Sequence, residues 1–232
     1  MRDRASPNHD ARPDGVRPDM LVMHYTGMTS AAAAIERLCD PAARVSSHYV
    51  VEEDGKVWRL VAEERRAWHA GESSWAGRHN LNAYSIGIEI VNPGHEFGYR
   101  PFPAVQMAAV TELAKEICAR RPIPPRYIVG HSDVAPHRKQ DPGELFDWKG
   151  LARHGIGLWP DFTNAQLTPP DGIAGIQTAL KTIGYELAVS GALDQRTEQV
   201  LVAFQRRFRA ENCAGGLDPE AARGGERWPA TT

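Results

Sequence analysis

The segment Ser85-Ile86-Gly87-Ile88-Glu89-Ile90-Val91 decides the fold of this chain. Side chains point to alternate faces of a β-strand, so the three isoleucines share one face and Glu89 lies on the other. An aliphatic stripe of this length is typical of a strand packed into a hydrophobic core. The segment therefore predicts a central buried strand that carries a carboxylate on the face opposite its isoleucines.

Three further strands are predicted before this segment. The apolar run Leu21-Val22-Met23-His24-Tyr25 predicts a core strand with His24 near its end. The Asp54-Gly55 pair lies between two β-rich runs, residues 47–52 and 56–61, and predicts an antiparallel hairpin.

Helices are predicted between these strands. Ser30 is a good N-cap, and the proline after Asp40 ends helices, so residues 30–39 predict one helix. A longer amphipathic helix is predicted over residues 103–120, where apolar residues recur every four positions: Val105, Ala109, Leu113 and Ile117. Residues 127–130 predict another strand, and residues 145–148 open a short closing helix. Strands interleaved with helices indicate an α/β or α+β domain.

The chain divides into two predicted domains. Between residues 154 and 170 the apolar periodicity is lost and prolines accumulate, which is typical of a linker. Beyond it, two helices are predicted from apolar residues at helical spacing: Ile176, Leu180 and Ile183 on the first, and Val200, Phe204 and Phe208 on the second. The predicted organisation is a first domain over residues 1–153, a linker over 154–170 and a small helical domain over 171–232.

Composition excludes several classes of protein. With 232 residues and a formal net charge of −2, the chain has no basic footprint for nucleic acid. No stretch reaches the roughly 18 apolar residues of a membrane span. The amino terminus lacks the apolar core of a secretory signal. Cys39, Cys118 and Cys213 show no CxxC spacing and are expected to be free thiols.

A candidate metal site follows the strand predicted at residues 127–130. The loop Gly130-His131-Ser132-Asp133-Val134-Ala135-Pro136-His137-Arg138-Lys139-Gln140-Asp141-Pro142-Gly143 is rich in turn residues and contains imidazole, ammonium and carboxylate groups. Two histidines and one carboxylate form an established ligand set for catalytic zinc, and His24, His131 and Asp141 supply it. Zinc lowers the pKa of a bound water from about 16 to about 7, which provides a nucleophile at neutral pH.

Hydrolysis of an amide also needs a proton donor and a group that stabilises the oxyanion. Glu89 fits the first role. Lys139 fits the second, because in an extended segment it points to the same side as Asp141.

Spacing alone leaves other interpretations open. Glu89 could be a structural carboxylate that is hydrogen-bonded to a loop, and Lys139 could be a solvated surface charge. His48, Asp133 and His137 are rival ligands, because each is close in sequence to a proposed one.

Four motifs, taken together and in order, resemble the zinc-dependent N-acetylmuramoyl-L-alanine amidases related to T7 lysozyme and AmpD, and the opening Ser6-Pro7-Asn8-His9-Asp10-Ala11-Arg12-Pro13 looks like the start of their AmiD branch. The motifs are Leu21-Val22-Met23-His24-Tyr25-Thr26, Ala67-Trp68-His69-Ala70-Gly71, Ser85-Ile86-Gly87-Ile88-Glu89-Ile90 and the loop from Gly130 to Gly143. Joint matching of four ordered motifs is far more specific than any one of them.

The resemblance implies a fold, a reaction and a site. The implied fold is a central mixed β-sheet flanked by helices. The implied reaction is cleavage of the amide between the lactyl group of N-acetylmuramic acid and L-alanine, in peptidoglycan or muropeptides. By resemblance, His24, His131 and Asp141 are ligands of Zn²⁺, Glu89 is the acid/base and Lys139 stabilises the oxyanion.

The resemblance also suggests residues that shape the substrate groove. Trp68 and His69 belong to a motif that lies beside the site in relatives, and Asn82 is in the polar loop before the Glu89 strand. The alternative for Trp68 is a place in the core, since aromatic residues are often buried.

The carboxy-terminal pattern, with Gly184-Tyr185, Gly191-Ala192-Leu193-Asp194 and Phe204-Gln205, looks like the three-helix peptidoglycan-binding domain often fused to such amidases. A generic helical bundle would show the same apolar spacing. Wall binding would raise the local substrate concentration and favours the cell envelope, whereas the missing leader favours the cytoplasm. We expect a monomer.

Two other functions are compatible with parts of this pattern. A noncatalytic peptidoglycan-binding or sensing protein would keep the groove and lose a zinc ligand, and retention of all three ligands with Glu89 speaks against it. A zinc peptidase acting within the stem peptide would use the same metal chemistry with a different pocket shape.

Overall fold

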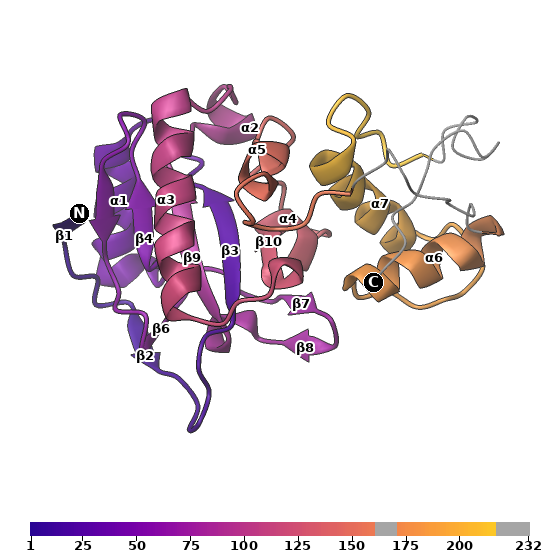
Figure 1. Ribbon diagram of the computed structural model, residues 1–232, viewed down its shortest axis with the longest axis horizontal. Coiled ribbons are helices and arrows are strands. Elements are labelled where there is room, and N and C mark those ends of the chain that lie inside the picture. Colours follow the sequence, from indigo (N-terminus) through magenta and orange to yellow (C-terminus); the bar gives the residue numbers. More distant parts are fainter. Residues whose placement is uncertain (161–170, 217–232) are drawn as a thin grey trace.

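A six-stranded sheet forms the centre of the computed structural model, which describes residues 1–160 and 171–216 (Figure 1). The strand order is β1-β5-β4-β9-β3-β10. The strands are β1 (Arg2–Asp3), β3 (Met20–Tyr25), β4 (Tyr49–Val51), β5 (Val57–Arg59), β9 (Ser85–Ile90) and β10 (Ile128–Gly130). Only β4 and β5 pair antiparallel, across the predicted Asp54-Gly55 turn, and all other neighbours are parallel. The sheet is therefore mixed, and the five strand predictions are confirmed.

Within the described residues, two small antiparallel ribbons and three short 3₁₀ turns lie beside this sheet. The ribbons pair β2 (His9–Ala11) with β6 (Arg65–Ala67) and β7 (Ser74–Trp75) with β8 (Arg78–His79). The 3₁₀ turns are η1 (Pro41–Ala43), η2 (Leu81–Ala83) and η3 (Pro125–Tyr127). Strand β6 ends at Ala67, so its pairing with β2 helps to fix the positions of the next two residues, Trp68 and His69.

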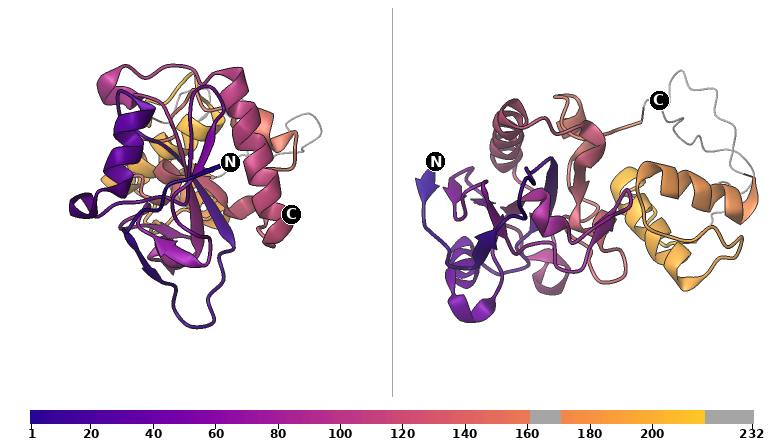
Figure 2. Two further views of the ribbon diagram at one scale, coloured as in Figure 1. Left: turned by 90° about the vertical axis from the view of Figure 1, so that its left-hand side faces the viewer. Right: turned by 90° about the horizontal axis from the view of Figure 1, so that it is seen from below.

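Helices cover both faces of the sheet. They are α1 (Ala31–Cys39), α2 (Gly94–Phe97), α3 (Ala104–Arg120), α4 (His131–Val134) and α5 (Trp148–Ala152). Figure 2 shows α1 and α3 on opposite sides of the sheet. Ser30 caps α1 by accepting a hydrogen bond from the backbone of Ala33, as its N-cap position predicts. The fold is thus the predicted central mixed sheet between helices.

The buried face of α3 differs from the prediction. Val105 is 55% exposed, whereas Gln106, Val110 and Leu113 are buried together with Ile117. The prediction counted apolar residues at steps of four, and each such step overshoots a full turn by about 40° in a helix of 3.6 residues per turn. The buried residues of α3 are instead spaced by three or four positions, which keeps them on the side of the helix that faces the sheet. The helix itself is confirmed, and the predicted face is wrong at its first turn.

The two faces of β9 separate the core from the site. Its isoleucines pack against α3 in one apolar cluster, as the alternation predicts; that cluster includes Ile86, Ile88, Ile90, Val110, Leu113, Ala114 and Ile117. Glu89 lies on the other face, in register with His24 of the parallel strand β3. Because β3, β9 and β10 run in the same direction, their carboxyl ends lie at one edge of the sheet.

The carboxy-terminal segment contains the two predicted helices, α6 (Gly172–Ile183) and α7 (Gln195–Phe208). They lie beside β10 and α4 in Figure 1, at the end of the sheet away from β1. Residues 161–170 of the predicted linker and residues 217–232 of the predicted domain lie outside the described residues. Within residues 171–216 there are two helices, so the three-helix domain stays a prediction.

These two helices share a hydrophobic core with the first domain. One apolar cluster combines residues of the sheet and of α4 with residues of the carboxy-terminal segment: Met20, Val22, Val129 and Val134 with Leu180, Tyr185, Val200, Leu201 and Phe204. Residues near the start of the predicted linker are also packed, because Ile156 is buried and the Trp159 ring lies 5.8 Å from that of Phe208. Among the described helices, none is long and apolar enough to cross a membrane.

Candidate metal centre and active site

Two strands and a loop present the candidate ligands at one edge of the sheet. His24 is the fifth residue of β3, and Asp141 follows in the loop after α4. His131 comes directly after β10 and is the first residue of α4, not part of a loop as the sequence suggested. The turn closes because the Gly130 N–H donates to the Asp133 carboxylate (2.8 Å). The Ser132 N–H donates to the Asp141 carbonyl (2.8 Å), which holds the loop against α4.

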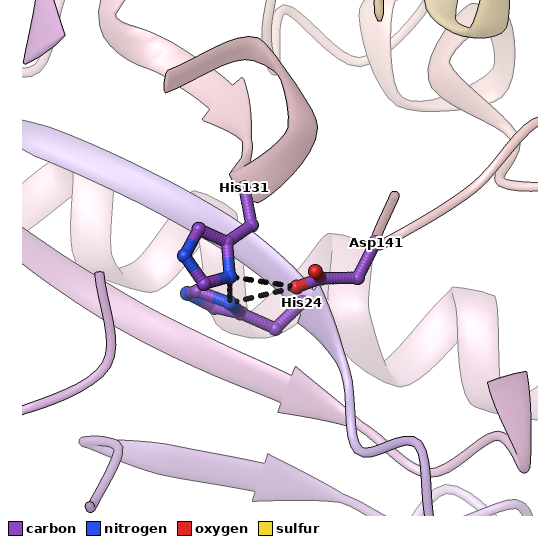
Figure 3. Close-up of side chains that lie close together, drawn as sticks. All are labelled: His24, His131 and Asp141. Carbon is purple, nitrogen blue, oxygen red and sulfur yellow. Dashed lines mark hydrogen bonds and ion pairs between the residues drawn. The ribbon is translucent and has the colours of Figure 1, made fainter. Parts of the chain in front are cut away.

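The three predicted ligands meet in a buried cluster (Figure 3). His24 Nδ1 and His131 Nδ1 are 2.9 Å apart, and Asp141 Oδ2 lies 3.0 Å from each of them. The three residues are at most 5% exposed. The structure therefore brings together groups that are 107 and 10 positions apart in the chain.

The protonation of His24 follows from a chain of hydrogen bonds behind it. The Ser85 hydroxyl donates to the Leu81 carbonyl (2.7 Å), so it can only accept from His69 Nε2 (3.2 Å). His69 Nδ1 then carries no proton and accepts from His24 Nε2 (3.0 Å). Because the single proton of neutral His24 is on Nε2, its Nδ1 directs a lone pair into the cluster.

His131 is oriented in the same way by a backbone carbonyl. Its Nε2 lies 3.1 Å from the Ala70 oxygen, which can only accept, so Nε2 carries the proton and Nδ1 presents a lone pair. Arg138 donates to the same carbonyl (2.5 Å) and to the Glu72 carbonyl, which fixes this part of the Trp-His-Ala-Gly segment.

The cluster therefore consists of two imidazole lone pairs and a carboxylate oxygen with no proton among them. Three such groups at 2.9–3.0 Å repel one another unless a cation lies between them. Two neutral histidines and one carboxylate form a known ligand set for catalytic zinc, and histidine ligands usually donate their second N–H to a fixed acceptor, as both do here. The donor set fits a zinc ion.

The rival ligands have other partners. His48 Nδ1 accepts from the Gly87 N–H (3.0 Å), and its Nε2 lies 3.1 Å from the Arg65 carbonyl. Asp133 pairs with Arg207 (2.7 Å), and His137 is exposed near Arg196. Tertiary contacts therefore separate these three residues from the ligands that their sequence positions could not distinguish.

Glu89 faces a cavity of about 500 Å³ that the three ligands also line. Its Oε2 atom is buried and has no hydrogen-bond partner among the described residues. The residue as a whole is partly exposed, on the side that lines the cavity. Burial and the nearby charge of Asp141 raise the pKa of Glu89 well above its ordinary value. An unpaired buried carboxyl is expensive in a purely structural role, so this environment favours a functional one.

Lys139 lines the same cavity and forms no ion pair with any described residue. Its charge acts on two groups of the site, because it lowers the pKa of both Glu89 and His24. The cation is thus directed at the site and is available to a substrate oxygen, as its predicted role requires.

The electrostatics keep the ligands in the states that a metal needs. Burial and the proximity of His131 lower the pKa of His24 to about 4. Burial raises the pKa of Asp141, but the neighbouring histidines lower it further, so that it lies below its ordinary value. His24 is therefore neutral and Asp141 is ionised at neutral pH.

The predicted groove residues have different surroundings. Trp68 is half-buried and lies between the 500 Å³ cavity and a second cavity of about 310 Å³, so it is not simply a core residue. Asn82 lines the second cavity, and its Oδ1 accepts from the backbone N–H groups of His69 and Ala70 (3.1 and 2.7 Å). His69 lines the first cavity and contacts His24, so it supports a ligand whether or not it touches substrate.

Sequence reasoning missed why Gly87 interrupts the central strand. A Cβ atom on Gly87 would lie 2.5 Å from the ring of His69, so a side chain there would displace the residue that orients His24. A glycine inside a strand signals the close approach of another group, and that signal was available in the sequence. The roles of His69 and Arg138 as supports for the ligands depend on tertiary contacts that no spacing rule indicates.

The raised pKa of Glu89 predicts a pH-dependent stability in the metal-free protein. The unfolded chain releases the Glu89 proton near pH 4.3, whereas the folded protein holds it to higher pH, so the unfolded state binds fewer protons above about pH 4.3. The free energy of unfolding therefore falls as the pH rises through this range. Glu89→Gln removes this contribution and should have a higher Tm than the wild type at pH 8 and the same Tm at pH 4.

The measurement is thermal unfolding of both proteins with a chelator present, at several pH values. A difference in Tm that does not change with pH would contradict the assignment of a raised pKa to Glu89. Glu96→Gln, at the rim of the same cavity, is the control and should not alter the pH dependence.

Comparisons with known proteins agree with this geometry. The family model described as N-acetylmuramoyl-L-alanine amidase matches residues 14–144. The N-acetylmuramoyl-L-alanine amidase AmiD of Escherichia coli (strain K12) is 38% identical over 224 residues, which cover 88% of this chain and 79% of AmiD.

Two solved structures are similar over about nine tenths of the chain. AmpDh3 from Pseudomonas aeruginosa, in complex with anhydromuramic pentapeptide, has a TM-score of 0.79 and 38% identity and covers 90% of both chains. AmiD from E. coli, in complex with the substrate anhydro-N-acetylmuramic acid-L-Ala-D-γ-Glu-L-Lys, has a TM-score of 0.75 and 37% identity and covers 90% of this chain and 88% of its own. The similarity therefore continues beyond the region that the family model matches.

Proposed function

Because this chain belongs to the N-acetylmuramoyl-L-alanine amidase family and resembles AmiD and AmpD, we propose that it cleaves the amide between the lactyl group of N-acetylmuramic acid and L-alanine. One observation carries the proposal: two histidine lone pairs and a carboxylate converge beside a cavity that also contains an unpaired glutamate. This arrangement supplies both a metal site and a proton-transfer group for hydrolysis of an amide.

The resident metal of the proposed enzyme is Zn²⁺, held by His24, His131 and Asp141. When bound there, zinc lowers the pKa of a water molecule to about 7 and so supplies a nucleophile at neutral pH. The support for zinc is the donor set itself. Nε2 of His24 donates to His69, and Nε2 of His131 donates to the Ala70 carbonyl, so that both Nδ1 atoms are free to bind the metal.

Glu89 is the proposed acid/base. It accepts a proton from the attacking water and delivers it to the departing nitrogen of L-alanine, which would otherwise leave as a poor amide anion. Its raised pKa suits a carboxyl that must both take up and release a proton near neutral pH.

Lys139 is the proposed stabiliser of the negative charge that develops on the carbonyl oxygen. A fixed cation in a partly enclosed cavity stabilises such a charge more strongly than it would in bulk water. Because Lys139 forms no ion pair with a described residue, no competing carboxylate has to be displaced.

The proposed substrate is a peptidoglycan-derived muropeptide. The two similar structures are complexes of AmpDh3 and AmiD with anhydromuramic peptides. Trp68 lines both the cavity of about 500 Å³ and the second cavity, where Asn82 lies, and the first cavity is large enough for a peptide with a sugar. All five proposed metal and catalytic residues come from one chain, so a monomer suffices.

The carboxy-terminal segment is proposed to bind peptidoglycan, as its sequence pattern predicts. The inactive full-length variant Glu89→Gln permits a direct measurement, because it should sediment with intact sacculi without digesting them. Sedimentation equal to that of an unrelated protein of similar charge would contradict wall binding.

Mass spectrometry of digested muropeptides tests the proposed reaction. The purified zinc-loaded protein should release free stem peptide that begins with L-alanine, from soluble anhydromuropeptide, from sacculi or from both. Shortened stem peptides would indicate a peptidase instead, and no product from either substrate would indicate a binding protein. Comparison of the two substrates also shows whether a soluble or a polymeric form is preferred.

A further inference from the structure

Asp133 connects the helix that carries His131 to the carboxy-terminal segment. Its carboxylate is 2% exposed and lies on α4, two residues after the proposed ligand. Oδ1 accepts from the Tyr185 hydroxyl (2.6 Å), and Oδ2 accepts from Arg207 (2.7 Å) and from the Gly130 N–H (2.8 Å). Two of its three donors therefore come from residues after 170.

Arg207 contacts three elements of the first domain at once. It is 6% exposed although it belongs to α7. Its guanidinium donates to Asp133 on α4 and to the Ile128 carbonyl on β10 (3.1 Å), and it lies 4.0 Å from the centre of the Trp148 ring on α5. Strand β10 and helix α4 are the two elements that join at His131.

Aromatic and apolar contacts and a backbone hydrogen bond strengthen the same interface. The Tyr185 ring packs edge-on against Trp75 (4.9 Å), and the Ala76 N–H donates to the Gly184 carbonyl (2.7 Å). The residues of α6 and α7 that face the sheet belong to the same buried cluster as Val129 and Val134, which flank His131 in the chain.

Helix α4 depends on these contacts for its position. It contains only four residues, and a helix this short is not stable without tertiary packing. Its first residue, His131, must hold its Nδ1 atom in a fixed direction for metal binding, and the supports of a ligand determine that direction.

We propose that Asp133, Arg207 and Tyr185 are positioning residues for His131, so that the carboxy-terminal helices complete the metal site instead of acting only as a wall-binding attachment. The proposal rests on the proposed zinc amidase function. Removal of this contact should weaken zinc binding and lower kcat while KM changes little, because none of the residues that line the cavity of about 500 Å³ belongs to α6 or α7.

The test uses three variants of the full-length chain. Tyr185→Phe removes one hydrogen bond and keeps the ring. Arg207→Met removes the cation and leaves the buried charge of Asp133 without an ion-pair partner, which strongly destabilises the folded protein. The double variant Asp133→Asn with Arg207→Met leaves no orphan charge and is expected to fold even where Arg207→Met does not. Lys181→Met, on the exposed surface of α6, is the matched control.

Three quantities are measured for each folded variant: the zinc dissociation constant, the absorption spectrum of the cobalt-substituted protein, and kcat and KM for muropeptide. The double variant should bind zinc roughly 10- to 100-fold more weakly than the wild type, with an altered cobalt spectrum, and Tyr185→Phe should show a smaller change in the same direction. Lys181→Met should match the wild type.

A lower Tm together with unchanged zinc affinity, cobalt spectrum and kcat in the double variant would overturn the proposal, since the contact would then serve stability alone. Failure of the proposed function gives a different result: the wild-type protein itself would bind no zinc or release no stem peptide. The two failures are therefore distinguishable.

Discussion

Glu89→Gln should lower kcat by roughly 10²- to 10⁴-fold, the usual contribution of a positioned acid/base group, while the zinc content stays at the wild-type level. The amide has the size and shape of the carboxyl but cannot accept a proton from water or deliver one to the L-alanine nitrogen. Because Glu89 lies outside the ligand cluster, metal binding does not depend on it. The measurements are steady-state hydrolysis of muropeptide and metal analysis of the same preparation.

The control for this variant is Glu96→Gln, which removes another carboxylate from the rim of the same cavity. It should retain nearly full activity. Hydrolysis by Glu89→Gln at the wild-type rate would remove the assigned role of Glu89, and loss of zinc together with activity would mean that the glutamate holds the metal site together.

Asp141→Ala should abolish zinc binding and, with it, all measurable hydrolysis. The variant loses the only anionic ligand, and two neutral imidazoles remain. Zinc at about 100 times its Kd stabilises the folded state by about 2.7 kcal/mol, and this gain should be absent from the variant. The measurements are zinc content after dialysis and the change in Tm on addition of zinc.

Glu144→Gln is the matched control in the same loop, because its carboxylate faces His95 and Arg206 and not the ligand cluster. It should bind zinc and gain stability as the wild type does. Retention of stoichiometric zinc by Asp141→Ala would show that another group completes the site and would contradict the proposed ligand set.

The local elements of the fold could be predicted because short-range chemistry determines them. The alternation around Glu89 places one face of β9 in the core, Asp54-Gly55 forms the hairpin turn, and Ser30 caps the first helix. The face of α3 was predicted less well because steps of four residues approximate a period of 3.6 only over one or two turns.

The ligand set could be predicted only with the help of the resemblance. Spacing alone left His48, Asp133 and His137 as rivals, because sequence distance does not show which imidazole or carboxylate reaches a common point. The fold decides among them by giving each rival another partner, such as the Gly87 N–H for His48 and Arg207 for Asp133.

By itself, the sequence determined the strands, the main helices and the residue types that a zinc amidase requires, since alternation, capping and turn chemistry act between residues near each other in the chain. Only the tertiary structure decided which nitrogen of each histidine faces the metal position, because the partners of those nitrogens, His69 and the Ala70 carbonyl, are 45 and 61 residues away. It likewise decided that Arg207 of α7 reaches α4 across 74 residues. Hydrogen bonds of this kind depend on distances of a few tenths of an ångström, which only the packed core determines.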